Sequence, residues 1–539
     1  MLPALRTRPR LCGGRHGGLR AWLWAALAVA ALLLAGCGGG GGGTDSLTVT
    51  PPPPTPPVSG LVEAAQVAGR CVAPRAANAL DENGVAYGDQ AGTLGDEKAW
   101  VRSWIDETYL WYRDVRGLAA AVLDATGYAS AVAYFDALKS PALTASGAAR
   151  DRFHFSYDTP DWVAMSQSGI AYGYGFEVAL LSSRVPREAV IAFTHPGTPA
   201  SEAGIARGAR VLAIDGVDLV NDSTATGVDL LNAGLFPEVP GSHVFTVLDP
   251  GAAAPRSVTL NAQALASTPV QNVRTLPAPH QHVGYLLFND HIATAEPLLI
   301  DAIRQLKSAG VTELVLDLRY NGGGYLDIAS ELATMIAGTQ RTAGRVFERL
   351  SFNDRNPFAL TLAQRTTPFH AVSQGFSGAS GVALPTLDLG RVSVLTGPGT
   401  CSASEAIVNG LRGVGVQVDL IGGITCGKPY GFYPQDNCGT TYFAIQFEGV
   451  NDQGFGDYAD GFAPTCAVAD DFSHALGDPA EARLAAALSY RASGVCPQAA
   501  SQATTRSQPQ AAWAARSPDA GGPALVRPAP RDNRLYRGR

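Results

Sequence analysis

Short apolar runs alternate with helix-type patterns through the C-terminal half of the chain. The apolar runs span 283–288, 314–318 and 392–395, and apolar residues at helical spacing follow within 298–306, 326–336 and 405–411. Short apolar runs bounded by turn residues are typical of buried strands. Strands that alternate with helices are joined by crossover connections, which build parallel sheets. Residues 282–496 are therefore predicted to form a layered α/β core.

A serine-containing turn joins one of these strands to its helix. Residues 399–406 read Gly-Thr-Cys-Ser-Ala-Ser-Glu-Ala, between the apolar run 392–395 and the helical pattern that begins at Glu405. A hydroxyl in such a turn is exposed beside the free N–H groups of the first helical turn. The Ser402 hydroxyl can therefore attack a carbonyl whose oxyanion is held by backbone donors. Alternatively, Ser402 or Ser404 only caps the helix.

A lysine follows the next apolar strand in a glycine-rich turn. Residues 421–428 read Ile-Gly-Gly-Ile-Thr-Cys-Gly-Lys. Removal of a lysine from water lowers the pKa of its amine and allows it to act as a general base. Ser402 and Lys428 would then form a Ser-Lys dyad. The alternative is that Lys428 is a surface lysine in a turn.

A third segment combines a buried strand with a run of glycines. Residues 313–324 read Glu-Leu-Val-Leu-Asp-Leu-Arg-Tyr-Asn-Gly-Gly-Gly and precede the helical pattern 326–336. Three glycines allow the backbone to approach a ligand closely and to turn an N–H group toward it. The alternative is an ordinary glycine-rich connection between strand and helix.

Together these segments resemble the carboxyl-terminal processing serine peptidases, the tail-specific or tricorn-like family. The matching motifs are Asp317-Leu-Arg-Tyr-Asn-Gly-Gly-Gly324, Ser402-Ala-Ser-Glu405 and Thr425-Cys-Gly-Lys428. The resemblance covers roughly residues 95–495. It implies Ser402 as nucleophile, Lys428 as base, and the N–H groups of Ala403 and of Gly323 or Gly324 as the oxyanion hole, with no cofactor.

The segment around Lys428 departs from the family pattern. The usual Phe-Gly-Lys-Gly is Cys-Gly-Lys-Pro here. Many members carry a glutamine four residues after the lysine, which orients its amine, and Phe432 occupies that position in this chain. Gln435 lies three residues further on and is the predicted orienting residue, which requires a different loop path.

Two modules are expected before the core. Residues 71–168 carry an aromatic stripe at helical spacing, formed by Trp100, Trp104, Tyr109 and Trp111, and resemble the family's helical cap. Residues 169–265 resemble a PDZ domain, a β-barrel-like module that binds extended C-termini by strand addition. Its expected peptide-binding loop is Tyr172, Gly173, Tyr174, Gly175 and Phe176. A PDZ-shaped module without a ligand is the alternative.

The resemblance thus implies an α/β multi-domain fold. Its core, residues 275–496, would be the ClpP/crotonase-like ββα spiral. The PDZ domain would precede this core or be inserted into it. Residues 497–539 contain no usable pattern and are predicted to be disordered.

The N-terminus resembles a bacterial lipoprotein signal. Residues 1–36 place five arginines before an uncharged apolar run that is short for a membrane span and ends in Leu34-Ala-Gly-Cys37. This resemblance implies cleavage before Cys37 and lipid on its sulfur, and the glycine after Cys37 implies the outer membrane, facing the periplasm. Residues 37–70, rich in glycine and proline, would be a tether. A single-span anchor is the alternative.

Six cysteines remain after Cys12 and Cys37, an even number that suggests up to three disulfides in an oxidising compartment. The pairs Cys426–Cys438 and Cys71–Cys496 are predicted, although fifteen pairings are possible. A disulfide at Cys401 and Cys426 would instead brace the site. Cys401 as nucleophile is a further alternative, but no histidine is near it in sequence. No Cys-x-x-Cys or His-x-x-x-His pairing indicates a metal site.

Charge excludes one class of partner. The total is −7, and each arginine-rich end (1–36 and 497–539) contributes +5, so residues 37–496 carry about −17. A globular part this acidic argues against nucleic acid as a partner.

The predicted function is an exported, lipid-anchored serine endopeptidase that acts on proteins with apolar C-termini. One alternative is a non-catalytic PDZ or apolar-ligand binding protein. The other is a crotonase-like acyl-CoA enzyme, against which export argues, because an exported enzyme would be separated from cytoplasmic CoA.

Overall fold

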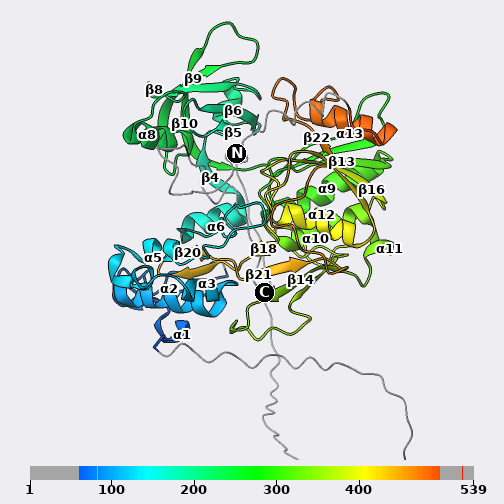
Figure 1. The fold of residues 1–539 in the computed structure, drawn as a ribbon. Coiled ribbons are helices and arrows are strands. Elements are labelled where there is room, and N and C mark those ends of the chain that lie inside the picture. The colour runs from blue at the N-terminus through cyan, green and yellow to red at the C-terminus, as the bar shows by residue number, and fades with distance from the viewer. Residues whose placement is uncertain (1–59, 82, 498–524, 526–539) are drawn as a thin grey trace, which may run out of the picture. The chain divides into compact units, whose positions relative to one another are not determined.

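The computed structural model describes residues 60–81, 83–497 and Leu525 (Figure 1). The predicted signal 1–36, Cys37, the tether up to residue 59, and all of the tail except residues 497 and 525 lie outside these residues. Within the described part of the chain, no helix is both long enough and apolar enough to cross a membrane. Leu525 is buried, and its N–H donates to the Ser183 carbonyl, so the predicted disorder does not hold at this position.

The N-terminal region is mainly helical. Its elements are α1 (Ala64–Val67), β1 (Arg70–Cys71), β2 (Gln90–Ala91), α2 (Leu94–Thr108), α3 (Tyr112–Arg116), α4 (Ala120–Leu123), η1 (Ala125–Gly127), α5 (Ala131–Ala137), β3 (Phe155–Asp158) and α6 (Thr159–Ser168). Thr93 and Asp96 form a capping box that begins α2. Trp100, Trp104 and Tyr109 are buried in one apolar cluster, which confirms that the aromatic stripe is core.

Residues 170–266 form a separate seven-stranded antiparallel sheet with its own apolar core. Its strands are β4 (Ile170–Gly173), β5 (Phe176–Ser182), β6 (Glu188–Thr194), β7 (Arg210–Ile214), β8 (Val217–Asp218), β9 (Gly241–Leu248) and β10 (Arg256–Ala266), and its helices are α7 (Pro199–Glu202) and α8 (Ala225–Leu235). The sheet order is β4-β10-β9-β7-β6-β5, with β8 paired to β7. Strand β5 therefore lies at an edge.

The C-terminal part is built on a six-stranded sheet, which confirms the predicted α/β character. Its order is β11 (Val270–Thr275), β12 (Val283–Phe288), β13 (Glu313–Asp317), β16 (Arg391–Thr396), β17 (Gln417–Gly422) and β22 (Cys466–Ala467). Strands β12 to β22 pair in parallel, and β11 is antiparallel to β12. Consecutive side chains point to opposite faces of a sheet, and every residue of β12 is buried. Both faces of the sheet are therefore covered at this strand.

Helices cover the two faces differently. One face packs against α9 (Ala295–Ser308), α10 (Leu326–Ala337) and α12 (Ala403–Gly413), through residues such as Leu316 and Val394. The other face packs against α13 (Ala482–Ser493), through residues such as Val315 and Leu395. These helices and strands bear out the predicted patterns, and α12 begins two residues earlier than expected.

Besides the two-stranded sheet β1-β2, two smaller sheets complete the fold. One is antiparallel, with the order β15 (Thr366–Pro368), β14 (Val346–Phe352), β21 (Phe447–Val450) and β18 (Tyr430–Gly431), and the short helix α11 (Thr339–Thr342) precedes it. The other has the order β19 (Gln435–Asn437), β20 (Thr440–Phe443) and β3, so it joins the C-terminal segment to the N-terminal region. The neighbouring strands β20 and β21 therefore belong to different sheets.

An arginine network lies behind the glycine-rich turn. The buried Arg319 guanidinium donates to Asp317 Oδ1 at 3.0 Å, Asp470 Oδ1 at 2.8 Å and Glu481 Oε1 at 2.8 Å. Arg207, from the seven-stranded sheet module, donates to the same Asp470 oxygen at 2.7 Å and to the Tyr320 hydroxyl at 2.7 Å. Opposite charges and hydrogen bonds compensate the burial of this group.

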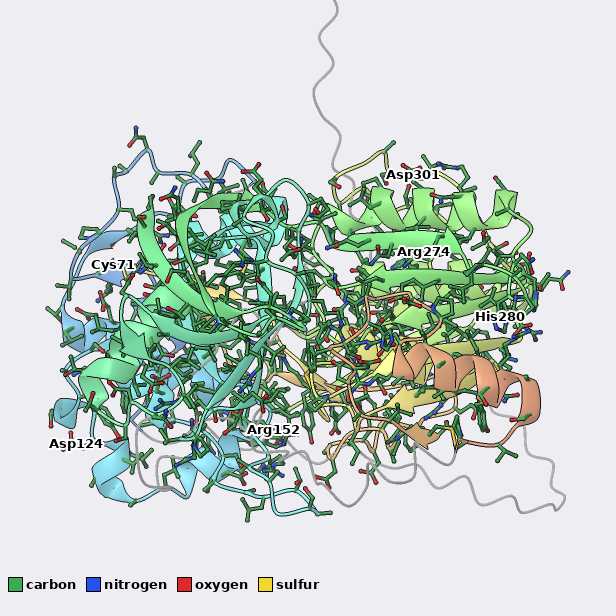
Figure 2. The ribbon with its side chains drawn as sticks, turned by 90° about the horizontal axis from the view of Figure 1, so that it is seen from above. Cys71, Asp124, Arg152, Arg274, His280 and Asp301 are labelled. Atoms are coloured by element: carbon green, nitrogen blue, oxygen red, sulfur yellow. A yellow bond between two sulfur atoms is a disulfide. The ribbon has the colours of Figure 1, made fainter. Side chains whose placement is uncertain are left out.

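The predicted disulfide pairs are wrong. The bonds join Cys71 to Cys438, Cys401 to Cys426, and Cys466 to Cys496 (Figure 2 labels Cys71). The sheet formed by β3, β19 and β20 brings Cys438 to the N-terminal region, a contact across 367 residues that sequence spacing does not reveal. The Cys401–Cys426 bond is the alternative pairing named in the sequence analysis, which braces the site.

Candidate active site

Three loops that carry the sequence motifs meet at one edge of the six-stranded sheet. They follow β13, β16 and β17, which are neighbours in parallel. The carboxyl ends of parallel strands lie at the same edge, where open α/β sheets generally bind ligands. Ser402, Ala403, Gly324 and Lys428 accordingly line a single cavity, which we call the Ser402 cavity.

Ser402 has an unusual backbone conformation. It is the residue before α12, with φ 55° and ψ −117°, a region that side chains rarely adopt. Such a conformation costs roughly 1–3 kcal/mol and persists only where the surroundings enforce it. The sharp turn places the hydroxyl beside the N-terminus of α12, whose first N–H groups have no helical partners. Ser402 also forms a capping box with Glu405, so the residue that begins α12 as its cap lines the cavity at the same time.

The glycine turn after β13 packs directly against the Ser402 turn. A Cβ atom on Gly323 would lie 2.8 Å from Ser402 Cβ and 2.9 Å from the Ala403 nitrogen, and its φ is 96°. Glycine is therefore required at position 323, because a Cβ atom would clash with the Ser402 turn and because other residues rarely adopt this φ. The buried Asn321 joins the turns, because its carbonyl accepts hydrogen bonds from the Cys401 N–H and the Ser404 hydroxyl.

The structure narrows the choice of oxyanion donors. The Gly323 N–H already donates to Asn321 Oδ1 at 3.0 Å. Among the described residues, no group accepts a hydrogen bond from the N–H of Gly324 or of Ala403. Both residues line the Ser402 cavity, so these two N–H groups can bind an oxygen there. Of the three predicted residues, Gly323 supports the turn, whereas Ala403 and Gly324 offer donors.

Lys428 is fully buried and its amine has no hydrogen-bond partner among the described residues. Its Nζ lies 4.1 Å from the centre of the Phe432 ring and 5.1 Å from that of Phe153. Burial lowers the pKa of the amine to about 7, although the carboxylates of Asp151 and Glu405 oppose this shift. The amine can therefore be neutral near pH 7, as a general base must be. It is not the surface lysine of the alternative interpretation.

The predicted orienting residue does not contact Lys428. The Gln435 side chain donates to the Asp436 carbonyl, and strand pairing with Tyr442 fixes its backbone in β19. Phe432, at the position of the family's glutamine, instead places its ring beside the amine. Phe153 comes from the N-terminal region, and the sequence contained no signal that it would reach this site.

Glu405 holds the two halves of the site together. Its buried carboxylate accepts hydrogen bonds from the N–H of Ser402 at 3.1 Å and from the N–H of Lys428 at 2.8 Å. It also accepts from the Gly427 N–H at 2.8 Å and the Thr425 hydroxyl at 2.5 Å. Burial raises the pKa of this carboxyl, and the four hydrogen bonds oppose that rise. The Ser-x-x-Glu spacing was visible in the sequence, but its contact with the Lys428 segment was not.

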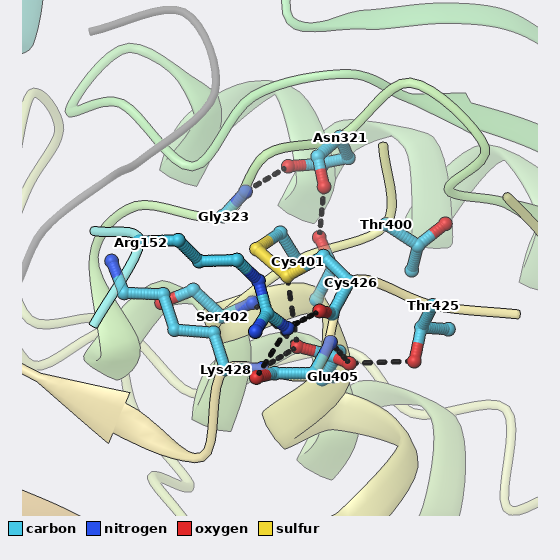
Figure 3. Close-up of a disulfide and its surroundings, with 12 residues drawn as sticks. Arg152, Asn321, Gly323, Thr400, Cys401, Ser402, Glu405, Thr425, Cys426 and Lys428 are labelled. Carbon is cyan, nitrogen blue, oxygen red and sulfur yellow. Dashed lines mark hydrogen bonds between the residues drawn. A yellow bond between two sulfur atoms is a disulfide. The ribbon is translucent and has the colours of Figure 1, made fainter. Parts of the chain in front are cut away.

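A disulfide connects the same two segments covalently. Cys401 precedes Ser402, and its bond to Cys426 closes a short loop to the segment that ends in Lys428 (Figure 3). Arg152, from the N-terminal region, donates to the Cys426 carbonyl on this segment (Figure 3). Cys401, Glu405 and Cys426 place possible metal ligands close together, but the two sulfurs are bonded to each other and are not available as thiolates.

A second cavity contains the predicted peptide-binding loop. Tyr172, Gly173, Tyr174, Gly175 and Phe176 all line it, together with His195 and Thr198. Gly173 ends β4 and Phe176 begins β5, so only Tyr174 and Gly175 form the connection. Tyr174 is buried, and its hydroxyl donates to the Gly234 carbonyl, so its side chain supports the module rather than facing a ligand.

Comparison with known proteins agrees with this geometry. Residues 282–433 match the model of peptidase family S41. Carboxyl-terminal-processing proteases of Picosynechococcus and Synechocystis are 29% identical over 265 residues and 31% identical over 139 residues. These alignments cover 49% and 26% of this chain, and only 56% and 32% of the relatives' own length. An S41 protease structure from Bacteroides fragilis aligns over 74% of this chain and 97% of its own, with 25% identity and a TM-score of 0.55.

The Cys401–Cys426 bond predicts a measurable effect on the reactivity of Ser402. Replacement of both cysteines by serine should slow labelling of Ser402 by a fluorophosphonate roughly 100-fold, since small displacements of reacting groups cost about this much. The removal of Cys466–Cys496, which is distant from Ser402 in sequence, serves as the matched control. Equal labelling rates in both double variants, measured by mass spectrometry, would show that the bond does not position the site.

Proposed function

We propose that this chain, which belongs to the carboxyl-terminal-processing peptidases of family S41, is a serine endopeptidase with a Ser402–Lys428 dyad. One observation carries the proposal. An amine whose pKa burial lowers to about 7 lines the same cavity as a serine at a strained turn and two N–H groups without described acceptors. This set supplies a base, a nucleophile and an oxyanion site.

The reaction follows from these positions. Neutral Lys428 takes the proton of the Ser402 hydroxyl as Oγ attacks the peptide carbonyl. The N–H groups of Ala403 and Gly324 donate to the oxyanion that forms. The Lys428 ammonium then returns its proton to the departing amine, which breaks the peptide bond and leaves an acyl-enzyme. Water, deprotonated by the same amine, hydrolyses the ester and releases Ser402.

The two modules are given separate roles in this proposal. The six-stranded sheet and its helices would be the ClpP/crotonase-like core that performs the chemistry. Residues 169–265 would be a PDZ domain that captures the apolar C-terminus of a substrate protein. The edge position of β5 and the cavity at residues 172–176 support this role, because PDZ domains bind a C-terminus as an added edge strand.

We also propose that the peptidase is exported and anchored by lipid on Cys37 to the outer membrane, facing the periplasm. The three disulfides among the described residues support an oxidising compartment. The mass of the N-terminal peptide of membrane-purified protein tests this, since it should begin at Cys37 with attached acyl chains. An unmodified residue at position 37 would contradict the proposal.

Replacement of either dyad member should abolish proteolysis without unfolding the chain. Full-length protein is incubated with an unstructured protein that ends in apolar residues, and products are identified by mass spectrometry. Ser402→Ala and Lys428→Met are expected to reduce cleavage by roughly 10³-fold or more. Lys428→Met keeps a side chain of similar length and should raise the melting temperature, because it removes a buried unpaired amine. A folded Lys428→Met variant with normal activity would overturn the dyad.

The dyad also predicts a pH profile. Below pH 7 the Lys428 amine is protonated and has no lone pair for the Ser402 proton, so kcat/KM should fall about tenfold per pH unit. Above pH 7 it should reach a plateau. The profile is measured with a single peptide substrate between pH 5 and 9, with circular dichroism to confirm the fold. A profile that is flat from pH 5.5 to 8 would exclude Lys428 as the base.

A further inference from the structure

The lining of the Ser402 cavity includes a buried carboxyl group, that of Glu348. Glu348 lies on β14 and Tyr458 on the segment after β21, and both line the cavity that contains Ser402 and Lys428. The Glu348 side chain is on the face of β14 opposite to Phe347, which packs in the apolar core against α12. Glu348 is 6% exposed and Tyr458 is 4% exposed.

Glu348 has no compensating partner in the described part of the chain. Among the described residues, no cation forms an ion pair with its carboxyl and no group donates a hydrogen bond to it. Burial alone raises the pKa of this carboxyl to about 8. The neighbouring Tyr458 hydroxyl is buried and has no hydrogen-bond partner among the described residues, and burial and the charge of Glu348 raise its pKa.

Two buried polar groups without partners are costly. An unsatisfied buried group costs roughly 1–3 kcal/mol, and more if it is charged. Leucine and phenylalanine would fill the same positions without this penalty, and replacing buried charges by apolar residues is often stabilising. A ligand that pairs with both groups would remove the penalty whenever it is bound.

The walls of the cavity indicate what kind of side chain fits. Leu326, Ala406 and Phe447 line it together with Ser402 and Glu348, and all three are buried apolar residues. They can pack against the methylene stem of a long side chain. In the same cavity, Glu348 offers carboxylate oxygens and Tyr458 a hydroxyl. A stem with a cationic tip satisfies both parts of this lining.

We propose that the Ser402 cavity is the pocket for the substrate residue whose carbonyl is attacked, and that Glu348 and Tyr458 select lysine or arginine there. This inference rests on the proposed peptidase function and deepens it. The side chain would insert its stem between Leu326 and Phe447 and pair its cation with the Glu348 carboxylate. Tyr458 would hold the carboxylate oxygen that faces it.

Other titratable groups in and near the cavity are compatible with a bound cation. Lys428 is the competing cation, but the mechanism uses its neutral form. Tyr430 and Tyr458 both line the cavity. Burial raises the pKa of each hydroxyl, so both stay neutral. Glu405 acts electrostatically on Tyr458 and adds negative potential. A substrate cation entering the cavity therefore finds one uncompensated carboxyl.

The test separates binding from cleavage. Full-length Ser402→Ala protein is titrated with two C-terminally amidated peptides that differ at one internal residue, lysine or norleucine, which has the same stem length without a charge. Any contact elsewhere on the protein contributes equally to both affinities. Active protein is then assayed for cleavage after the same residue.

Lysine should be favoured over norleucine roughly 10- to 100-fold in both affinity and kcat/KM, as expected for hydrogen bonds to a charged group. Glu348→Leu should abolish or reverse this ratio and raise the melting temperature. Glu348→Gln should lose most of the preference while keeping side-chain size. The control is Glu448→Leu, an exposed glutamate on the neighbouring β21, which should leave the ratio unchanged.

Each outcome decides between the two claims. A lysine preference in affinity that depends on Glu348, without any cleavage, would uphold the pocket and reject the peptidase function. Cleavage with equal use of lysine and norleucine would uphold the peptidase and overturn the pocket. A preference for norleucine over lysine, or a lysine preference that survives Glu348→Leu, would also overturn the proposal.

The pH dependence gives an independent readout. Because both peptides are cleaved by the same dyad, the titration of Lys428 cancels in the ratio of their kcat/KM values. Ionisation of Glu348 favours only the lysine peptide, so the ratio should rise from pH 6 to pH 9, with most of the change near pH 8 if the substrate binds weakly. A pH-independent ratio near unity would contradict an ionisable selector.

Discussion

The carboxylate of Glu405 is the contact on which the geometry of the site depends. One buried group accepts hydrogen bonds from the backbone of both the Ser402 turn and the Lys428 segment, which lie on different loops. Charge-assisted bonds of this kind are strong and directional. They fix the position of the nucleophile relative to the base before any substrate binds. The Cys401–Cys426 bond ties the same two loops together, so the site is preorganised twice.

Such anchoring leaves the Lys428 amine without a hydrogen-bond partner among the described residues. Glu405 binds the backbone N–H of Lys428, not its Nζ, and the amine faces the rings of Phe432 and Phe153. An aromatic wall excludes water and offers no acceptor that would hold a proton on the amine. The low pKa therefore comes from the same packing that orients the side chain. A glutamine at position 432 would solve the orientation differently, by a hydrogen bond.

Sequence patterns predicted the parts of the fold that depend on local periodicity. The strands and helices around Ser402 and the glycine turn were recognisable because each is a continuous segment whose apolar spacing is visible. Phe153, the Cys71–Cys438 bond and the position of Gln435 were not, because each depends on how distant segments pack. The choice of Gly324 over Gly323 required knowing that Asn321 already accepts the Gly323 N–H.

Some buried charged groups in this molecule have partners of opposite charge, and others have none among the described residues. Arg319 is surrounded by Asp317, Asp470 and Glu481, and that network also receives Arg207 from the neighbouring module, so its burial is compensated. Lys428 and Glu348 line the Ser402 cavity, and neither has a hydrogen-bond or ion-pair partner among the described residues. A structural charge is satisfied by the fold itself, whereas a charge that acts on a substrate must stay available.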